Sequence, residues 1–128
     1  MNLPPIEINL DEWEIVRELL QRHLPGREVW AFGSRVKRIA KPFSDLDLVI
    51  LGSQPLTLSA MADLADDFTE SDLPFKVDLV DWATTSPRFR AVIEAGYVVI
   101  QHPASGEAEA SRGASIPDSS TWRAERPS

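Results

Sequence analysis

The sequence predicts an α/β (α+β) fold in which helices pack on one small sheet. Helical and extended patterns alternate along residues 1–102 in the order αβαβαβα, and they predict about four helices and three or four strands. The chain has 128 residues, a length that suits one domain, and 43% of them are hydrophobic. It lacks an apolar run of about 20 residues, the length that crosses a membrane, so we expect a cytoplasmic protein without membrane contact.

The first helix is predicted from a wide apolar stripe over residues 11–24. Asp11 is the expected N-cap, because Glu14 follows three residues later as in a capping box. Pro25 and Gly26 are expected to end the helix, since this pair is typical of turns.

A short buried strand is predicted over residues 28–32 (EVWAF), directly after that helix. Gly33 and Ser34 interrupt the strand pattern and are expected to start a second helix, which continues to about residue 40. Pro42 is expected to stop this helix, because proline lacks the N–H that helical hydrogen bonding needs.

The clearest strand covers residues 45–51 (DLDLVIL), where apolar side chains alternate with others. Successive side chains of a strand point to opposite faces. Asp45, Asp47 and Val49 therefore share one face, and the other carries Leu46, Leu48 and Ile50. A further strand is predicted over residues 75–80 (FKVDLV), with Asp78 on the face opposite to its apolar side chains.

Two helices and an edge strand complete the predicted elements. An amphipathic helix covers residues 58–68. Its inward-facing side chains are expected to be Leu58, Met61, Leu64, Ala65 and Phe68, and its outward-facing ones Asp63, Asp66 and Asp67. Ser86 is the expected N-cap of the last helix, which has Pro87 at its first position and ends near Gly96. The packed residues of that helix are expected to be Phe89, Val92 and Ile93. Residues 97–100 are predicted as the edge strand.

Residues 103–128 differ from the rest of the chain, because proline and small residues dominate there. Ile116 and Trp122 are the large apolar residues of this stretch, too few to offset the entropy of ordering it. We therefore predict a folded domain over residues 1–102 and a disordered tail over residues 103–128.

The charge and the cysteine content exclude several kinds of function. The formal net charge is −7, which disfavours direct nucleic-acid binding. With no cysteine and two histidines, thiolate zinc sites and cysteine nucleophiles are excluded, and a histidine-rich metal site is not expected. A metal would therefore be held by carboxylates, which favours a hard cation such as Mg²⁺.

Three carboxylates are candidates for such a site. Asp45 and Asp47 lie side by side and repel each other, and a divalent cation would relieve that repulsion. If the strand that carries Asp78 is their neighbour, all three gather on one sheet face, and two Mg²⁺ ions would make them a phosphoryl- or nucleotidyl-transfer site. The alternative is that the D-x-D pair is only the polar face of an ordinary strand.

Two further features could bind phosphate. Gly33-Ser34 stands between a strand and a helix, where free N–H groups and a partial positive charge suit an anion, although many such pairs are simple turns. A basic run follows, whose members either neutralise a triphosphate or form a solvated helix face: Arg35, Lys37, Arg38 and Lys41.

A family resemblance enters with the stretch GSRVKRIAKPFSDLDL, in which Gly-Ser precedes D-x-D by ten residues. This pattern resembles the signature of the nucleotidyltransferase superfamily that includes DNA polymerase β, and FKVDLVDW resembles that family's third-acid strand. The resemblance covers about residues 10–100. The short chain is similar to the minimal nucleotidyltransferases (MNT type), which are typically encoded beside a HEPN-domain protein in prokaryotic toxin–antitoxin pairs. It implies the nucleotidyltransferase fold with a small mixed sheet.

The resemblance also implies roles for individual residues. Gly33 and Ser34 would hold the β- and γ-phosphates of ATP, the expected substrate. Two Mg²⁺ ions would be bound by Asp45, Asp47 and Asp78. The third acid, Asp78, would also help to activate the attacking hydroxyl. Candidates for further nucleotide contacts are Arg35, Lys37 and Arg38. One position departs from the pattern, because Arg38 stands where many members have a glycine.

The implied reaction moves AMP from ATP to a hydroxyl, with tyrosine expected, of a partner protein. The implied partner is a HEPN ribonuclease toxin, which the chain would neutralise as an antitoxin within a hetero-oligomer. A single small domain leaves little material to enclose an acceptor, and this favours a macromolecular one. Two alternatives stay open: an antitoxin that neutralises by binding alone, and a nucleotidyltransferase that acts on a small molecule.

Overall fold

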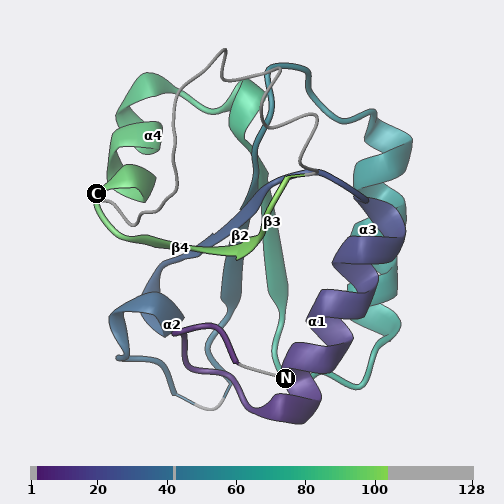
Figure 1. The fold of residues 1–128 in the computed structure, drawn as a ribbon, viewed down its shortest axis with the longest axis vertical. Helices are drawn as coiled ribbons and strands as arrows, with labels where there is room; N and C mark the ends of the chain where they lie inside the picture. Colours follow the sequence, from purple (N-terminus) through teal and green to yellow (C-terminus); the bar gives the residue numbers. More distant parts are fainter. Residues whose placement is uncertain (1–2, 42, 104–128) are drawn as a thin grey trace.

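The computed structural model describes residues 3–41 and 43–103, and it has the predicted fold class (Figure 1). The helices within these ranges are α1 (Leu10–His23), α2 (Ser34–Lys37), α3 (Leu58–Glu70) and α4 (Pro87–Glu94), with a 3₁₀ turn, η1 (Trp82–Thr84). The strands are β1 (Val29–Phe32), β2 (Leu46–Ile50), β3 (Val77–Asp81) and β4 (Tyr97–Gln101). Their order is the predicted one. Apart from residue 103, the predicted tail lies outside the described residues.

The strands form one mixed sheet in the order β3-β2-β1-β4. β1 runs antiparallel to both of its neighbours, whereas β2 and β3 are parallel. α3 makes the crossover that two parallel strands need. Because β2 and β3 are parallel, their first residues meet at the same end of the sheet.

The two faces of the sheet are covered differently. α1 and α3 lie side by side on the first face (Figure 1) and bury the main core, which includes Val16, Leu20, Leu46, Leu48 and Leu64. α4 covers part of the second face through Ile93, which packs with Phe32 and Val49. Asp47 of β2 and Asp78 of β3 belong to this second face, because they alternate with core residues such as Leu46 and Leu48.

The N-cap of α1 differs from the prediction. Asn9, not Asp11, caps the helix: its side chain accepts from the N–H of Glu12 at 2.8 Å. The Glu12 carboxylate in turn accepts from the N–H of Asn9 at 3.1 Å. The capping box is thus the predicted motif placed two residues earlier, because Asn9 and Glu12 have the same spacing as Asp11 and Glu14.

α2 is shorter than predicted and ends at Lys37 rather than near residue 40. Arg38 adopts a left-handed conformation, with φ 64° and ψ 34°, which cannot continue a right-handed helix. Pro42, the predicted stop, lies outside the described residues.

Three apolar side chains predicted to pack are instead exposed. Phe89 and Val92 of α4 are 38% and 57% exposed, whereas Ile93 is buried as predicted. α4 is short, so only a narrow stripe of it meets the sheet. Leu58 is 91% exposed because it is the first residue of α3, where side chains tilt back toward the helix N-terminus and away from the core.

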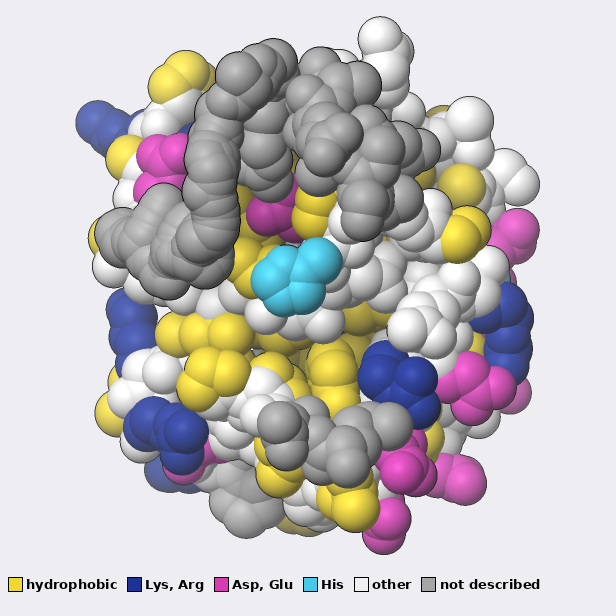
Figure 2. Space-filling view, in the orientation of Figure 1, with side chains coloured by type: hydrophobic (Ala, Val, Ile, Leu, Met, Phe, Trp, Pro, Cys, Tyr) yellow, Lys and Arg dark blue, Asp and Glu magenta, His cyan; other side chains and the backbone are white. Residues whose placement is uncertain are grey.

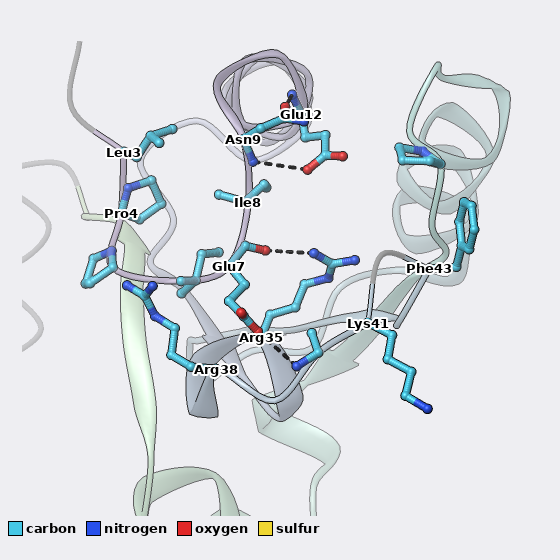
Figure 3. Close-up of a pocket in the computed structure, with 14 residues that line it drawn as sticks. Leu3, Pro4, Glu7, Ile8, Asn9, Glu12, Arg35, Arg38, Lys41 and Phe43 are labelled. Atoms are coloured by element: carbon cyan, nitrogen blue, oxygen red, sulfur yellow. Dashed lines mark hydrogen bonds between the residues drawn. The ribbon is translucent and has the colours of Figure 1, made fainter.

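Buried Arg35 joins the N-terminal segment to the loop between α2 and β2 (Figure 3). Its guanidinium donates to the carbonyl of Glu7 at 2.7 Å and to the carbonyl of Ser44 at 2.8 and 3.1 Å. It also lies 4.0 Å from the ring centre of Phe75. The side chain of Glu7 completes the link by accepting from the N–H of Ala40 at 2.9 Å.

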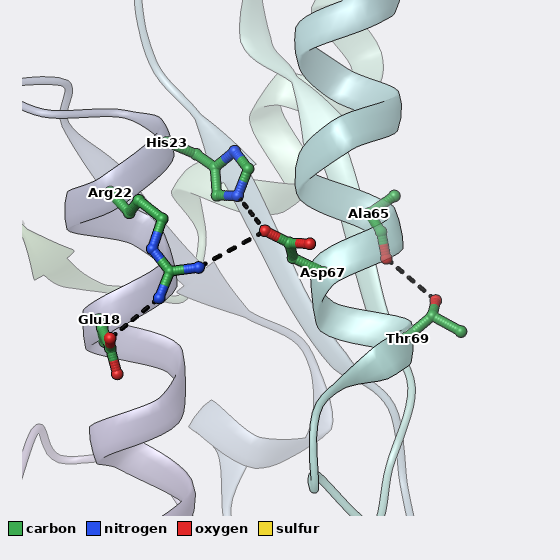
Figure 4. A network of polar contacts seen from close by, with 6 residues as sticks. All are labelled: Glu18, Arg22, His23, Ala65, Asp67 and Thr69. Atoms are coloured by element: carbon green, nitrogen blue, oxygen red, sulfur yellow. Dashed lines mark hydrogen bonds and ion pairs between the residues drawn. The ribbon is translucent and has the colours of Figure 1, made fainter.

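A second polar link joins α1 to α3 (Figure 4). Nε2 of His23 lies 2.6 Å from Oδ2 of Asp67, and Arg22 lies 3.7 Å from the same oxygen. Arg22 also pairs with Glu18 at 2.9 Å. Asp67 was predicted to face solvent, but it lies between the two helices, because α1 packs beside α3 at this point.

Charged side chains of both signs appear on the visible surface (Figure 2). Lys and Arg gather where Figure 1 places α2, and Asp and Glu gather around the start of α1. In the part of the chain that the structure describes, none of the helices is both long and apolar enough to cross a membrane.

Arg35→Met should lower the free energy of unfolding by about 2–4 kcal/mol, because the carbonyls of Glu7 and Ser44 would lose their donor. Urea denaturation of the two proteins measures the difference. Lys37→Met is the matched control, because Lys37 is exposed on the same helix and should change stability by less than about 0.5 kcal/mol. Equal stability of the Arg35 variant and the unaltered chain would refute this role.

Candidate active site

Two of the predicted acids lie side by side on the second face of the sheet. Asp47 of β2 is the direct register partner of Asp78 of β3. Because the strands are parallel, both side chains leave the sheet on the same side. Asp45 comes just before β2 and is exposed. The structure therefore brings Asp47 and Asp78 together, with Asp45 beside them at the start of the strand.

The ionisation of Asp47 reflects this crowding. The pKa of Asp47 is raised from 3.8 to about 6, first by burial and then by the negative charges of Asp78 and Asp45 and by hydrogen bonding with the Asp78 carboxyl. The ionised form of Asp47 is thus disfavoured in the folded protein. A cation held between these carboxylates would reverse that effect.

Gly33 shapes the turn that faces these acids. It is the N-cap of α2, with a φ of 85°, a conformation that glycine adopts readily and other residues rarely do. A Cβ at this position would collide with Oδ2 of Asp47. Glycine therefore allows the turn and the carboxylate to approach each other. Ser34 follows as the first residue of α2 and is half-buried.

The basic side chains of residues 35–38 extend in different directions. Ser34 and Lys37 are three residues apart on α2 and share one side of it, and Lys37 is exposed. Arg35 is buried and its guanidinium bonds to the carbonyls of Glu7 and Ser44, so its contact with the nucleotide stays a prediction. Arg38 is exposed and extends toward the segment that carries Pro4 (Figure 3).

The left-handed backbone of Arg38 explains why glycine suits this position. A non-glycine residue in this region carries strain of about 1 kcal/mol or more. The N–H of Ile39 donates to the carbonyl of Ser34 at 3.1 Å and closes the turn after α2. Arg38 thus ends the helix in a conformation that glycine would adopt without this strain.

One further charged residue lies close to the acids. Lys76 was not singled out as a site residue, yet its Nζ lies 3.7 Å from Oδ1 of Asp78. The sequence signal was that Lys76 and Asp78 are two residues apart, which puts both on one face of β3. Asp81 lies on the opposite face of β3 and is a cap, because its carboxylate accepts from the N–H of Ala83 at 3.2 Å and of Leu56 at 2.8 Å.

The acids fit a hard divalent cation, although the three are not already gathered around one point. Among residues 3–41 and 43–103, no group of three His, Asp or Glu side chains has the spacing of a metal site. Asp47 and Asp78 are nevertheless adjacent, and a bound cation would relieve the repulsion that contributes to the raised pKa of Asp47. Carboxylate oxygens are the donors that Mg²⁺ prefers.

The chain is similar to known proteins over the whole of this region. Residues 14–103 match the family described as Polymerase beta, Nucleotidyltransferase. The probable protein adenylyltransferase MntA of Haemophilus influenzae is 53% identical over 96 residues, which cover 75% of this chain and 84% of that protein.

Solved structures share the fold. A toxin–antitoxin crystal structure with AMP-PNP aligns with a TM-score of 0.61 at 23% identity and covers 77% of this chain and 78% of the matched chain. A structure of a tri-AMPylated Shewanella oneidensis HEPN toxin in complex with an MNT antitoxin aligns with a TM-score of 0.55 at 22% identity, covering 77% and 75% of the two chains.

Asp47→Asn should raise the melting temperature by a few degrees at about pH 7.5 without divalent cations. The folded protein raises the pKa of Asp47 from 3.8 to about 6, so this carboxyl lowers stability progressively between these pH values and by its full amount above about pH 6. Added Mg²⁺ should stabilise the unaltered chain more than the variant, because the variant lacks a ligand.

Thermal unfolding with EDTA and with Mg²⁺ measures both effects. Asp63→Asn is the control, because Asp63 is exposed on α3 and should change neither. A lower melting temperature for Asp47→Asn in EDTA, or an equal response of both proteins to Mg²⁺, would contradict this account.

Proposed function

Because the chain belongs to the polymerase beta nucleotidyltransferase family, we propose that it transfers AMP from ATP to a hydroxyl group of a partner protein. The observation that carries the proposal is the Asp47–Asp78 pair facing the Gly33 turn. The name of the Haemophilus influenzae relative, a probable protein adenylyltransferase, supports AMP as the transferred group and a protein as the acceptor.

The proposed acceptor is a tyrosine hydroxyl of a HEPN-domain toxin, a ribonuclease that the modification would neutralise. The toxin in one of the structurally similar complexes is tri-AMPylated and is bound to an MNT antitoxin. The same fold and the much higher identity to the Haemophilus influenzae protein support a corresponding pair here. The working unit would then be a complex of this chain, over residues 1–102, with its toxin.

Residues of this chain would hold ATP across the second face. The N–H groups at the start of α2, with the Ser34 hydroxyl, would bind the β- and γ-phosphates. Lys37, on the same side of α2 as Ser34, would neutralise part of their charge. Gly33 leaves room for the phosphates beside the Asp47 carboxylate.

Asp45, Asp47 and Asp78 would hold Mg²⁺. When bound, the metal lowers the pKa of the acceptor hydroxyl and stabilises the leaving pyrophosphate. Asp78, on the outer strand β3, would face the acceptor and help to take its proton. The acceptor oxygen bonds to the α-phosphorus while the bond to the bridging oxygen breaks, so AMP stays on the acceptor and pyrophosphate leaves.

Neutralisation by binding alone is the second candidate function. It is favoured by two observations: the acids are not gathered as a ready metal site in the described ranges, and strained Arg38 stands where many members have glycine. In this case the toxin would be covered by the chain and would carry no AMP.

Co-expression with the toxin should add about 329 Da per AMP to the toxin, as observed by intact-protein mass spectrometry, with ATP and Mg²⁺ as the substrates. The double variant Asp45→Ala, Asp47→Ala should leave the toxin unmodified and toxic. A toxin that the unaltered chain neutralises without any mass increase would overturn the proposed transfer, and neutralisation by the double variant would favour the binding role.

Lys37→Met should raise the KM for ATP about tenfold, because a charge-assisted contact to phosphate would be lost. Arg38→Met is the comparison, and we expect a smaller effect because its side chain extends toward the Pro4 segment (Figure 3). Steady-state kinetics with the toxin as acceptor measure both. A larger effect from Arg38 than from Lys37 would contradict the assignment of phosphate binding to the Ser34 side of α2.

A further inference from the structure

We propose that the ring of Phe89 is the surface on which the purine base of the bound nucleotide stacks. This inference rests on the proposed function, because it names where the nucleoside part of ATP would lie. Its starting point is the unexpected exposure of Phe89, whose ring contacts Phe32 on the second face of the sheet.

The position of Phe89 relative to the acids follows from two contacts. Its ring lies 5.9 Å from the ring of Phe32, with an angle of 79° between the ring planes. Phe32 is the direct register partner of Asp47 across β1 and β2. Phe89 is therefore separated from Asp47 by one ring contact and one spacing between neighbouring strands. This separation is comparable to the length of a nucleoside, and the Asp47 carboxylate would face the α-phosphate.

The geometry of in-line transfer restricts where the base can go. β3 and β1 flank β2 on opposite sides, so the acceptor would approach from the side of Asp78 on β3 and the pyrophosphate would leave toward the Gly33 turn after β1. The attacking oxygen, the α-phosphorus and the leaving oxygen lie on one line, so the nucleoside must extend from the phosphorus at an angle to that line. One of the directions that remain runs along the second face toward α4, where Phe89 is 38% exposed.

The other aromatic side chains of this face already have partners on their rings. Trp30 stacks on Tyr97 with a centroid distance of 3.9 Å, and the guanidinium of Arg90 lies 4.8 Å from the ring centre of Trp82. Phe89 instead meets Phe32 edge to face and keeps part of its surface open to solvent. A phenyl ring offers no directional hydrogen bond, so it would favour a large base without reading its exocyclic groups.

Titration calorimetry of the full chain with Mg²⁺ tests this proposal, with ATP and inorganic tripolyphosphate as the two probes. Phe89→Ala and Phe89→Leu should each raise the Kd for ATP about tenfold and leave the Kd for tripolyphosphate unchanged. Phe89→Tyr should bind ATP as the unaltered chain does. Phe89→Leu keeps an apolar side chain against Phe32, so it separates stacking from packing.

Val92→Ala is the matched control, because Val92 is exposed on the same helix and should change neither Kd. An unchanged Kd for ATP in the Phe89 variants would overturn the proposal, and so would equal weakening of both probes, which indicates a structural role. If the unaltered chain binds both probes but Phe89→Leu affects only the KM for the toxin, the ring contacts the acceptor and the proposal is wrong. Binding of neither probe to the unaltered chain would overturn the proposed function itself.

Discussion

Two carboxylates held side by side and partly buried repel each other, and this repulsion is the constraint on which the site depends. Asp47 and Asp78 meet because β2 and β3 are parallel neighbours in register. The cost appears in the raised pKa of Asp47. A fold that served stability alone would have little reason to keep acids at both positions, since apolar residues would pack there without repulsion.

The surrounding structure accommodates these acids rather than neutralising them. Gly33 leaves space that any Cβ would fill, and Lys76 offers a cation 3.7 Å from Asp78 but on a largely exposed side chain. Exposed ion pairs contribute little, so Lys76 does not replace a bound metal. Arg35 is a buried cation, but its guanidinium donates to the carbonyls of Glu7 and Ser44 and stabilises the loop that leads into β2.

Local patterns in the sequence predicted much of the fold and the core of the site. Alternation by two residues placed Asp47 and Asp78 on the face opposite the core leucines, and the Gly-Ser pair marked the end of β1. Effects that depend on distant contacts were missed. The burial of Arg35 depends on carbonyls that lie 28 and 9 residues away in the chain. The exposure of Phe89 depends on how little of α4 meets the sheet, which periodicity cannot reveal.

The central claim is that Asp47 and Asp78 together hold a divalent cation with the nucleotide. Electron paramagnetic resonance of Mn²⁺, added with ATP to the full chain, measures this binding directly. The account predicts a ternary complex with the unaltered chain and at least about tenfold weaker Mn²⁺ binding with Asp78→Asn. Equal Mn²⁺ affinity in the two proteins in the presence of ATP would contradict it.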